Sequence, residues 1–169
     1  MVSGEPFYDP QGRWLGSVLS CFGIICNLDA IERLGMRSPP QRWEDLADPR
    51  FFPEIALANP TQSSSVNKSF EMLIQQQMQL EMAERTAGGG GASNEDEAAA
   101  IEAGWTRAMR LLMKIGANAR YFTDASAKIP LDVSTGDCAA GMTIDFYGRY
   151  QSGAVKRADG TTPVKYINV

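Results

Sequence analysis

The amino-acid sequence predicts a three-layer α/β/α sandwich, in which a β-sheet lies between two layers of helices. Apolar runs with hydrophobic side chains on both alternating faces recur along the chain, which is typical of strands covered on both sides. Between these runs lie segments with apolar residues at 3.6-residue spacing, which indicate helices that bury one face. The chain has 169 residues and a hydrophobic fraction of 44%, which suits one domain with one normal core.

The first predicted strand spans residues 14–26, an apolar run that follows the turn signal Asp9-Pro10-Gln11-Gly12. Both of its alternating faces are apolar, so we expect helices on both sides of it. A short helix should follow, because Asn27 or Asp29 can cap its N-terminus and Gly35 can end it.

The next segment predicts a short helical turn and a second strand. Residues 38–50 place Trp43 and Leu46 on one side of a helix. Residues 54–59 contain the apolar run Ile55-Ala56-Leu57-Ala58, and Pro60 follows them. We therefore expect a second buried strand there.

Two amphipathic helices flank a glycine-rich segment in the middle of the chain. The first should begin directly after Ser65 and continue to Met82 at helical spacing, and the second covers residues 101–115 and stops at Gly116. Between them, four consecutive glycines and an acidic cluster predict a flexible surface loop over residues 86–97 within the single domain of residues 1–169.

The C-terminal third alternates between strands and helices. Strands are predicted for residues 119–122, 138–145 and 165–169. Helices are predicted for residues 126–135 and from residue 146 to 151. This alternation completes the pattern that favours the three-layer architecture.

The composition excludes several classes of function. The chain has no histidine, which removes histidine-based catalytic triads and histidine metal ligands. Its net charge of −4 lacks the basic excess with which proteins bind nucleic acid. Dinucleotide-binding, phosphate-loop and nucleophile-elbow motifs are absent from the sequence, so we expect neither a cofactor nor an enzyme activity.

Cysteine use and hydropathy bear on the compartment. Cys21, Cys26 and Cys138 are an odd number in unrelated contexts, which favours buried thiols over a metal or redox site and leaves one disulfide open. The sequence has no apolar run of about 18 residues that would predict a membrane span. Residues 1–6 lack the charged and apolar regions of a secretory signal.

The strongest candidate site is the segment Asn59-Pro60-Thr61-Gln62-Ser63-Ser64-Ser65, between the end of a strand and the start of a helix, and its candidate ligand residues are Thr61, Gln62, Ser63 and Ser64. Ligands of open α/β sheets bind outside the carboxyl ends of strands. A helix N-terminus offers unpaired N–H groups and the positive end of its dipole, both of which favour an anion. The alternative is that Ser63 to Ser65 only cap the helix, and the two interpretations carry similar weight.

Two further strand ends carry polar residues. Ser126 follows the third strand, and Asp145 and Tyr147 follow the fourth. Each has a structural alternative, as a helix cap or a half-buried aromatic ring. Tyr147 and Tyr150 would also suit a ferric ion through their phenolates, although the metal ligands remain unassigned. Three polar strand ends on one sheet predict a binding site more strongly than any one of them.

Six motifs follow one another along nearly the whole chain. They are Gly12-Arg13-Trp14-Leu15-Gly16, Phe22-Gly23-Ile24-Ile25-Cys26-Asn27, Pro40-Gln41-Arg42-Trp43-Glu44-Asp45-Leu46, Ala58-Asn59-Pro60-Thr61-Gln62-Ser63, Val133-Ser134-Thr135-Gly136-Asp137-Cys138-Ala139-Ala140-Gly141-Met142 and Asp145-Phe146-Tyr147-Gly148-Arg149. In order and spacing they resemble the inserted second lobe of periplasmic solute-binding proteins of ABC importers, in the type II, iron(III)-binding-like group.

The resemblance implies a mixed sheet and a two-lobed protein that closes on a solute and delivers it to an ABC permease. The first lobe would lie outside this chain, and the protein would be periplasmic, or extracellular and membrane-anchored in a Gram-positive cell. The family's ligand loops correspond to Thr61–Ser64, Ser126 and the Asp145–Tyr147 edge. Iron-binding members usually carry two adjacent tyrosines at the last edge, whereas Phe146 precedes Tyr147 here. A small organic anion or a phosphorylated or phosphonate-like compound is therefore expected at least as much as ferric ion.

Two other classes of function remain open at this stage. An effector-sensing regulatory domain shares the two-lobed fold, and a DNA-binding helix-turn-helix N-terminal to this segment would favour it. An enzyme lobe of similar fold would use Lys128 or Asp145 for acid–base chemistry.

Overall fold

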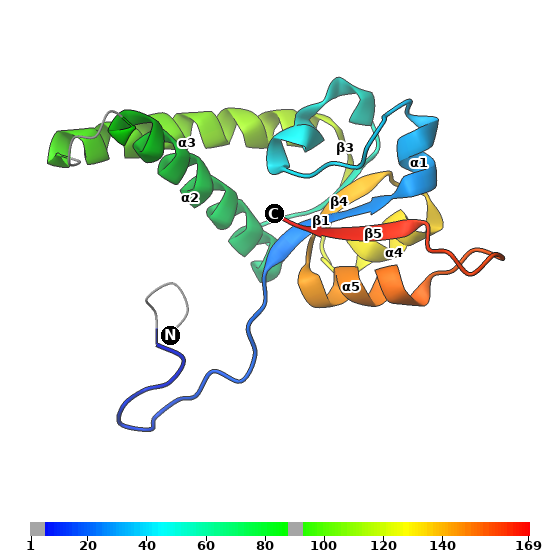
Figure 1. The fold of residues 1–169 in the computed structure, drawn as a ribbon, viewed down its shortest axis with the longest axis horizontal. Coiled ribbons are helices and arrows are strands. Elements are labelled where there is room, and N and C mark those ends of the chain that lie inside the picture. The colour runs from blue at the N-terminus through cyan, green and yellow to red at the C-terminus, as the bar shows by residue number, and fades with distance from the viewer. Residues whose placement is uncertain (1–5, 88–92) are drawn as a thin grey trace.

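In the computed structural model, residues 6–87 and 93–169 are described, and they form a five-stranded mixed sheet in the order β3-β2-β4-β1-β5. The strands are β1 (Phe22–Asn27), β2 (Ile55–Ala58), β3 (Ala119–Thr123), β4 (Ala140–Ile144) and β5 (Val164–Asn168). β2 runs parallel to β3 and β4, whereas β1 runs antiparallel to β4 and β5. The carboxyl ends of β2, β3 and β4 therefore lie at one edge of the sheet (Figure 1).

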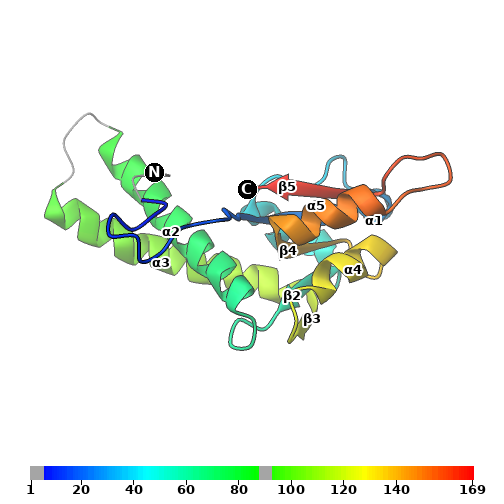
Figure 2. The same ribbon diagram turned by 90° about the horizontal axis from the view of Figure 1, so that it is seen from below.

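Helices cover both faces of the sheet, which confirms the three-layer prediction (Figures 1 and 2). One layer holds α1 (Leu28–Arg33), the 3₁₀ helices η1 (Trp43–Ala47) and η2 (Pro49–Phe51), and the long helices α2 (Ser64–Thr86) and α3 (Asn94–Ala117). The other layer holds α4 (Lys128–Thr135) and α5 (Asp145–Ala154). The distal halves of α2 and α3 project beyond the sheet.

The two faces of each central strand belong to two separate hydrophobic cores. In β1, Ile24 packs with η1 and the long helices, while Ile25 packs with α4. In β4, Met142 faces the first core, and the second core lies over Gly141, whose missing side chain lets Ile129 of α4 approach. Strands that are buried on both faces explain the continuous apolar runs of the sequence.

The prediction of a first strand over residues 14–26 is wrong for residues 14–21. β1 begins at Phe22, and residues 6–21 run away from the sheet as an extended segment (Figure 1). Leu15 and Val18 are more than three-quarters exposed. Within the described residues, the start of this segment folds back on itself, with Tyr8 bridging Leu15 and the N–H of Gly16 donating to the carbonyl of Phe7, and residues 14–20 pair with no strand of the sheet.

The predicted loop over residues 86–97 is partly wrong. α2 continues through Thr86, and α3 already begins at Asn94. Ser93 caps α3, because its hydroxyl accepts from the backbone N–H of Asp96, whose carboxylate in turn accepts from the N–H of Ser93. The acidic cluster is thus the first turn of a helix, where negative charge favours the helix dipole. Residues 88–92, which carry the glycines, lie outside the described residues.

All three cysteines are free thiols. Cys26 and Cys138 are fully buried, as predicted, whereas Cys21 is partly exposed and its Sγ lies 2.8 Å from Oδ1 of Asn168. Burial raises the pKa of Cys26 to about 12 and also raises the pKa of Cys138. Because the thiolate is the reactive form, both buried thiols should be inert at neutral pH.

This difference predicts one fast-reacting thiol in the native chain. At pH 8, a chromogenic disulfide reagent should modify Cys21 quickly and the other two cysteines only after unfolding in guanidinium. The control variant Cys21→Ser should show no fast phase. Rapid modification of a second thiol in the native protein would contradict the burial described here.

Candidate functional site

The three predicted loops emerge at the same edge of the sheet. Ala58 of β2 pairs with Thr123 of β3, and Ala56 pairs with Gly141 of β4, so the three strands end at similar heights. The segments that follow them lead directly into α2, α4 and α5. The structure therefore brings to one edge the three segments that contain the predicted site residues Thr61–Ser64, Ser126 and Asp145.

A chain of serine hydroxyls links the first two of these loops. The Oγ atoms of Ser63 and Ser65 lie 3.3 Å apart, and Ser65 Oγ donates to Ser126 Oγ at 2.9 Å. Ser63 and Ser126 are thus brought together, as predicted, through Ser65, which belongs to the candidate segment but is not among the predicted ligand residues. The signal was present in the sequence, since only one of three consecutive serines at a helix start can be its N-cap.

The serines do not act as the expected helix caps. Ser63 occupies the N-cap position of α2, but its side chain makes no capping hydrogen bond. The N-cap of α4 is Ala127, whose methyl group cannot cap a helix, and not Ser126. The backbone N–H groups of Ser64, Ser65 and Val66 have no hydrogen-bond partner among the described residues. The start of α2 therefore combines free N–H donors with hydroxyl groups, which suits an anion.

Thr61 and Gln62 form the outer part of this edge, where both are exposed. The amide and hydroxyl of Thr61 donate to Oδ1 of Asn59 at 3.0 and 2.8 Å, which closes the turn after β2. The side-chain amide of Gln62, with its nitrogen turned towards Asp124, donates to that carboxylate. The β2 and β3 loops are thus tied together by a second polar contact.

Asp145 and Tyr147 lie at the end of β4, where α5 begins. Asp145 is the first residue of α5 and not its N-cap, which is Ile144, so the capping alternative is wrong. Its backbone N–H donates to the carbonyl of Cys21 at 2.9 Å. Its carboxylate lies 3.8 Å from the guanidinium of Arg149, too far for a hydrogen bond. Tyr147 is partly exposed at the same helix start.

Lys128, the residue considered for acid–base chemistry, is engaged elsewhere. Its ammonium pairs with Asp132 one turn further along α4 and lies 4.3 Å from the centre of the Tyr121 ring. The hydroxyl of Tyr121 also donates to Asp132, and burial together with this carboxylate raises the pKa of the tyrosine. The three side chains form a closed structural cluster between β3 and α4.

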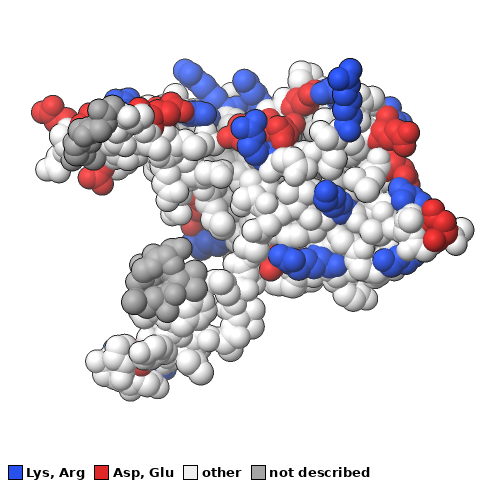
Figure 3. Space-filling view, in the orientation of Figure 1, with Lys and Arg blue, Asp and Glu red and all other residues white. Residues whose placement is uncertain are grey.

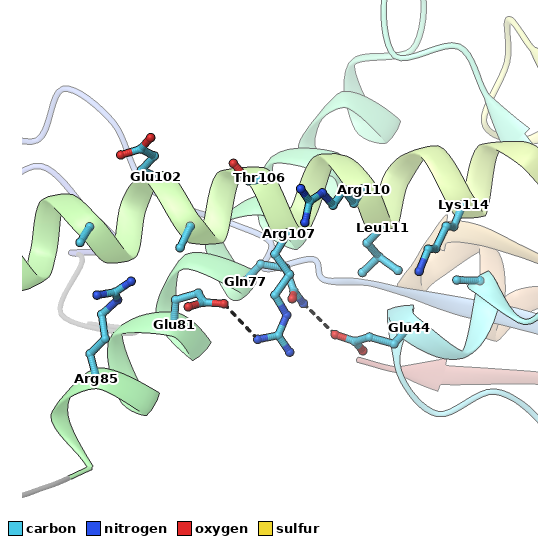
Figure 4. Close-up of a pocket in the computed structure, with 13 residues that line it drawn as sticks. Glu44, Gln77, Glu81, Arg85, Glu102, Thr106, Arg107, Arg110, Leu111 and Lys114 are labelled. Carbon is cyan, nitrogen blue, oxygen red and sulfur yellow. Dashed lines mark hydrogen bonds and ion pairs between the residues drawn. The ribbon is translucent and has the colours of Figure 1, made fainter.

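A cavity of about 790 Å³ lies away from this edge, between α2, α3 and η1 (Figure 4). Gln77 at its base donates to Glu44, while Arg107 pairs with Glu81 at its centre. In Figure 3 acidic side chains gather at the far end of the helical hairpin and basic ones over the C-terminal half of α3. Its lining carries three acidic and four basic side chains, of which Arg107 and Glu81 pair with each other, so the cavity presents no strong charge of one sign to a ligand.

Two absences hold for residues 6–87 and 93–169. No group of three or more Cys, Asp or Glu side chains is placed to hold a metal ion in this part of the chain. No helix there, including the two long ones, is apolar enough over a sufficient length to cross a membrane.

Several solved structures share the fold. The chain is 19% identical to the periplasmic binding protein P5PA, with a TM-score of 0.61 over 88% of this chain and 37% of that one. It is 16% identical to AfuA of Actinobacillus pleuropneumoniae, with a TM-score of 0.60 over 95% and 43% of the two chains. It is 14% identical to iron-bound HitA of Pseudomonas aeruginosa, with a TM-score of 0.51 over 95% of this chain and 41% of that one. These likenesses confirm the predicted type II periplasmic binding protein fold, and this chain spans less than half the length of each structure.

Two sequence comparisons agree with the fold. Over 75 residues, covering 42% of this chain and 22% of the other, the sequence is 27% identical to an uncharacterized protein of Haemophilus influenzae. Residues 1–147 match the family described as bacterial extracellular solute-binding protein. This match covers most of the sequence, and so the chain belongs to the family of bacterial extracellular solute-binding proteins.

Proposed function

We propose that this chain is one ligand-binding lobe of an ABC importer's solute-binding protein, and that the edge at the carboxyl ends of β2, β3 and β4 binds a small anion. The observation that carries the proposal is the hydroxyl chain from Ser63 through Ser65 to Ser126, beside the free N–H groups at the start of α2. Hydroxyls and helix N–H groups are donors that phosphate and carboxylate oxygens accept. This arrangement supports a binding role.

A second lobe and a permease are the partners that this function requires. The chain spans 37% and 43% of the length of P5PA and AfuA, which leaves room in such proteins for another lobe. β1 enters and β5 leaves the sheet beside the candidate site, since Gly23 pairs with Asn168 and Phe22 with Ile144 at this edge. We propose that a first lobe faces this edge and that the protein works in the periplasm, or outside a Gram-positive cell as a membrane-anchored protein.

Among anions, the polar groups favour a phosphorylated or phosphonate-like compound over ferric ion. The structure of AfuA contains fructose 6-phosphate, and that of HitA contains iron, so both kinds of solute occur on this fold. Ferric ion prefers oxygen ligands that carry negative charge. At this edge Asp124, Asp145 and Tyr147 carry oxygens of that kind, and Asp124 already accepts from Gln62, while the serine hydroxyls and N–H groups suit an anion better.

Calorimetric titration of the chain with inorganic phosphate, fructose 6-phosphate and ferric citrate tests this proposal. We expect the phosphate compounds to bind, and Ser126→Ala to weaken them about tenfold, because a hydrogen bond to a charged group contributes about 1.5 kcal/mol or more. The control Ser38→Ala changes an exposed hydroxyl near the opposite edge and should leave binding unchanged. Tight binding of ferric ion alone, or equal effects of both substitutions, would contradict the proposal.

A further inference from the structure

An apolar groove of about 400 Å³ lies between the first turns of α4 and α5. Both helices begin at the edge that holds the candidate anion site, because each follows a strand that ends there. The groove is lined by seven residues without a formal charge, namely Ala127, Pro130, Leu131, Phe146, Tyr147, Tyr150 and Gln151.

The large side chains of this groove are unusually accessible. Leu131 is 52% exposed, Phe146 50% and Tyr150 70%. Phe146 and Tyr147 form a tilted aromatic pair with ring centres 4.5 Å apart, which holds both rings in a defined orientation. Apolar side chains that are exposed next to one another often mark a binding site, whereas single exposed apolar residues are common on protein surfaces.

The groove lies next to the candidate anion site along the chain. Ala127 in its wall directly follows Ser126, the last member of the hydroxyl chain. Tyr147 belongs to both the groove and the predicted site. An apolar cavity of about this volume beside a few convergent polar groups is typical of small-molecule sites.

The size of the groove argues against a protein occupant. A stable interface between two proteins buries about 800 Å² on each side and involves roughly 20–30 residues of each. The seven residues of this groove are far fewer. A single ring or a short alkyl chain would fill it.

We propose that the groove is a subsite for the apolar part of the solute, so that the solute is an amphiphilic anion. This inference rests on the proposed function, since the anionic group binds at the hydroxyls of Ser63, Ser65 and Ser126. The apolar part extends from there past Ala127 and Tyr147 towards Leu131. The groove thus sets specificity, while the hydroxyls and helix N–H groups hold the charge.

Calorimetry with methyl phosphate and phenyl phosphate tests the subsite, because the two esters share the anionic group and differ in the ring. We expect phenyl phosphate to bind about tenfold more tightly, as burial of a ring predicts. Leu131→Gln should bring the ratio of the two affinities towards one. The matched control Met113→Gln, which replaces an exposed apolar residue of α3 in the other layer, should keep the ratio.

The outcomes separate this inference from the proposed function. Equal binding of both esters by the unmodified chain would overturn the subsite and leave the anion site standing. Binding of neither ester would overturn both. If Leu131→Gln abolished a concentration-dependent dimer in sedimentation and left the ratio unchanged, the groove would be an interface between copies and the subsite would be wrong.

Discussion

Gly104→Val is expected to destabilise the chain by about 3 kcal/mol, because the two long helices cross at this glycine without room for a side chain. A Cβ atom at Gly104 would lie 2.4 Å from the Cα and 2.7 Å from the backbone nitrogen of Met78 in α2. Backbone atoms cannot rotate away as a side chain can, so α2 and α3 would have to move apart. Their separation would loosen the first core, which includes Leu73 of α2 and Ala108 of α3.

Urea unfolding followed by circular dichroism measures this effect. The matched control is Gly153→Val in α5, where a Cβ would meet nothing within 4 Å. We expect the control to change the free energy of unfolding by about 0.5 kcal/mol or less, since valine and glycine differ little in helix propensity. Equal destabilisation by the two substitutions would show that helix propensity, and not the close approach to Met78, is responsible.

Asn27→Ala should cost about 2 kcal/mol, because one buried side chain joins three parts of the fold. Its Oδ1 accepts from the backbone N–H groups of Asp29 and Ala30 and so caps α1. Its Nδ2 donates to the carbonyl of Val133 in α4, which lies in the opposite helical layer. Loss of a cap costs about 1 kcal/mol, and loss of the bond to Val133, whose carbonyl still accepts from the N–H of Gly136, adds about 1 kcal/mol.

Two companion variants separate these contributions in the same unfolding experiment. Asn27→Ser keeps a capping oxygen and removes the donor to Val133, so only the second contribution should be lost. Asn67→Ala removes an exposed asparagine of α2 that donates to Glu71, and we expect a change of about 0.5 kcal/mol or less. The account of Asn27 is wrong if Asn27→Ala is no more destabilising than Asn67→Ala.

Hydrophobic periodicity predicts most of the elements because the strands and helices carry it locally. The central strands, both long helices and the final strand are found near their predicted residues. The main wrong prediction is the strand over residues 14–21. Their apolar pattern is that of a buried strand, but no strand of the sheet pairs with them. Periodicity describes which face of a segment is apolar and says nothing about what covers it. For the same reason, periodicity does not predict that the distal halves of α2 and α3 project beyond the sheet.

The edge that carries the candidate site is predictable, whereas its internal contacts are not. Ser63, Ser126 and Asp145 each follow a strand, and parallel strands end at one edge. The bond from Ser65 to Ser126 joins residues 61 positions apart in the sequence, so no local pattern can reveal it. The alternative that these serines only cap the helices is wrong for a related reason: the hydroxyls contact each other instead of the nearest backbone N–H groups. That these residues bind solute stays a prediction.

Nuclear magnetic resonance tests the central claim most directly, because it locates a bound anion on the chain. We expect titration of ¹⁵N-labelled protein with phenyl phosphate to shift the backbone amide signals of residues 62–66, 126–128 and 145–147. The amides around the 790 Å³ cavity, such as those of Gln77, Glu81 and Arg107, should keep their positions. Shifts confined to that cavity, with the edge unchanged, would contradict the account.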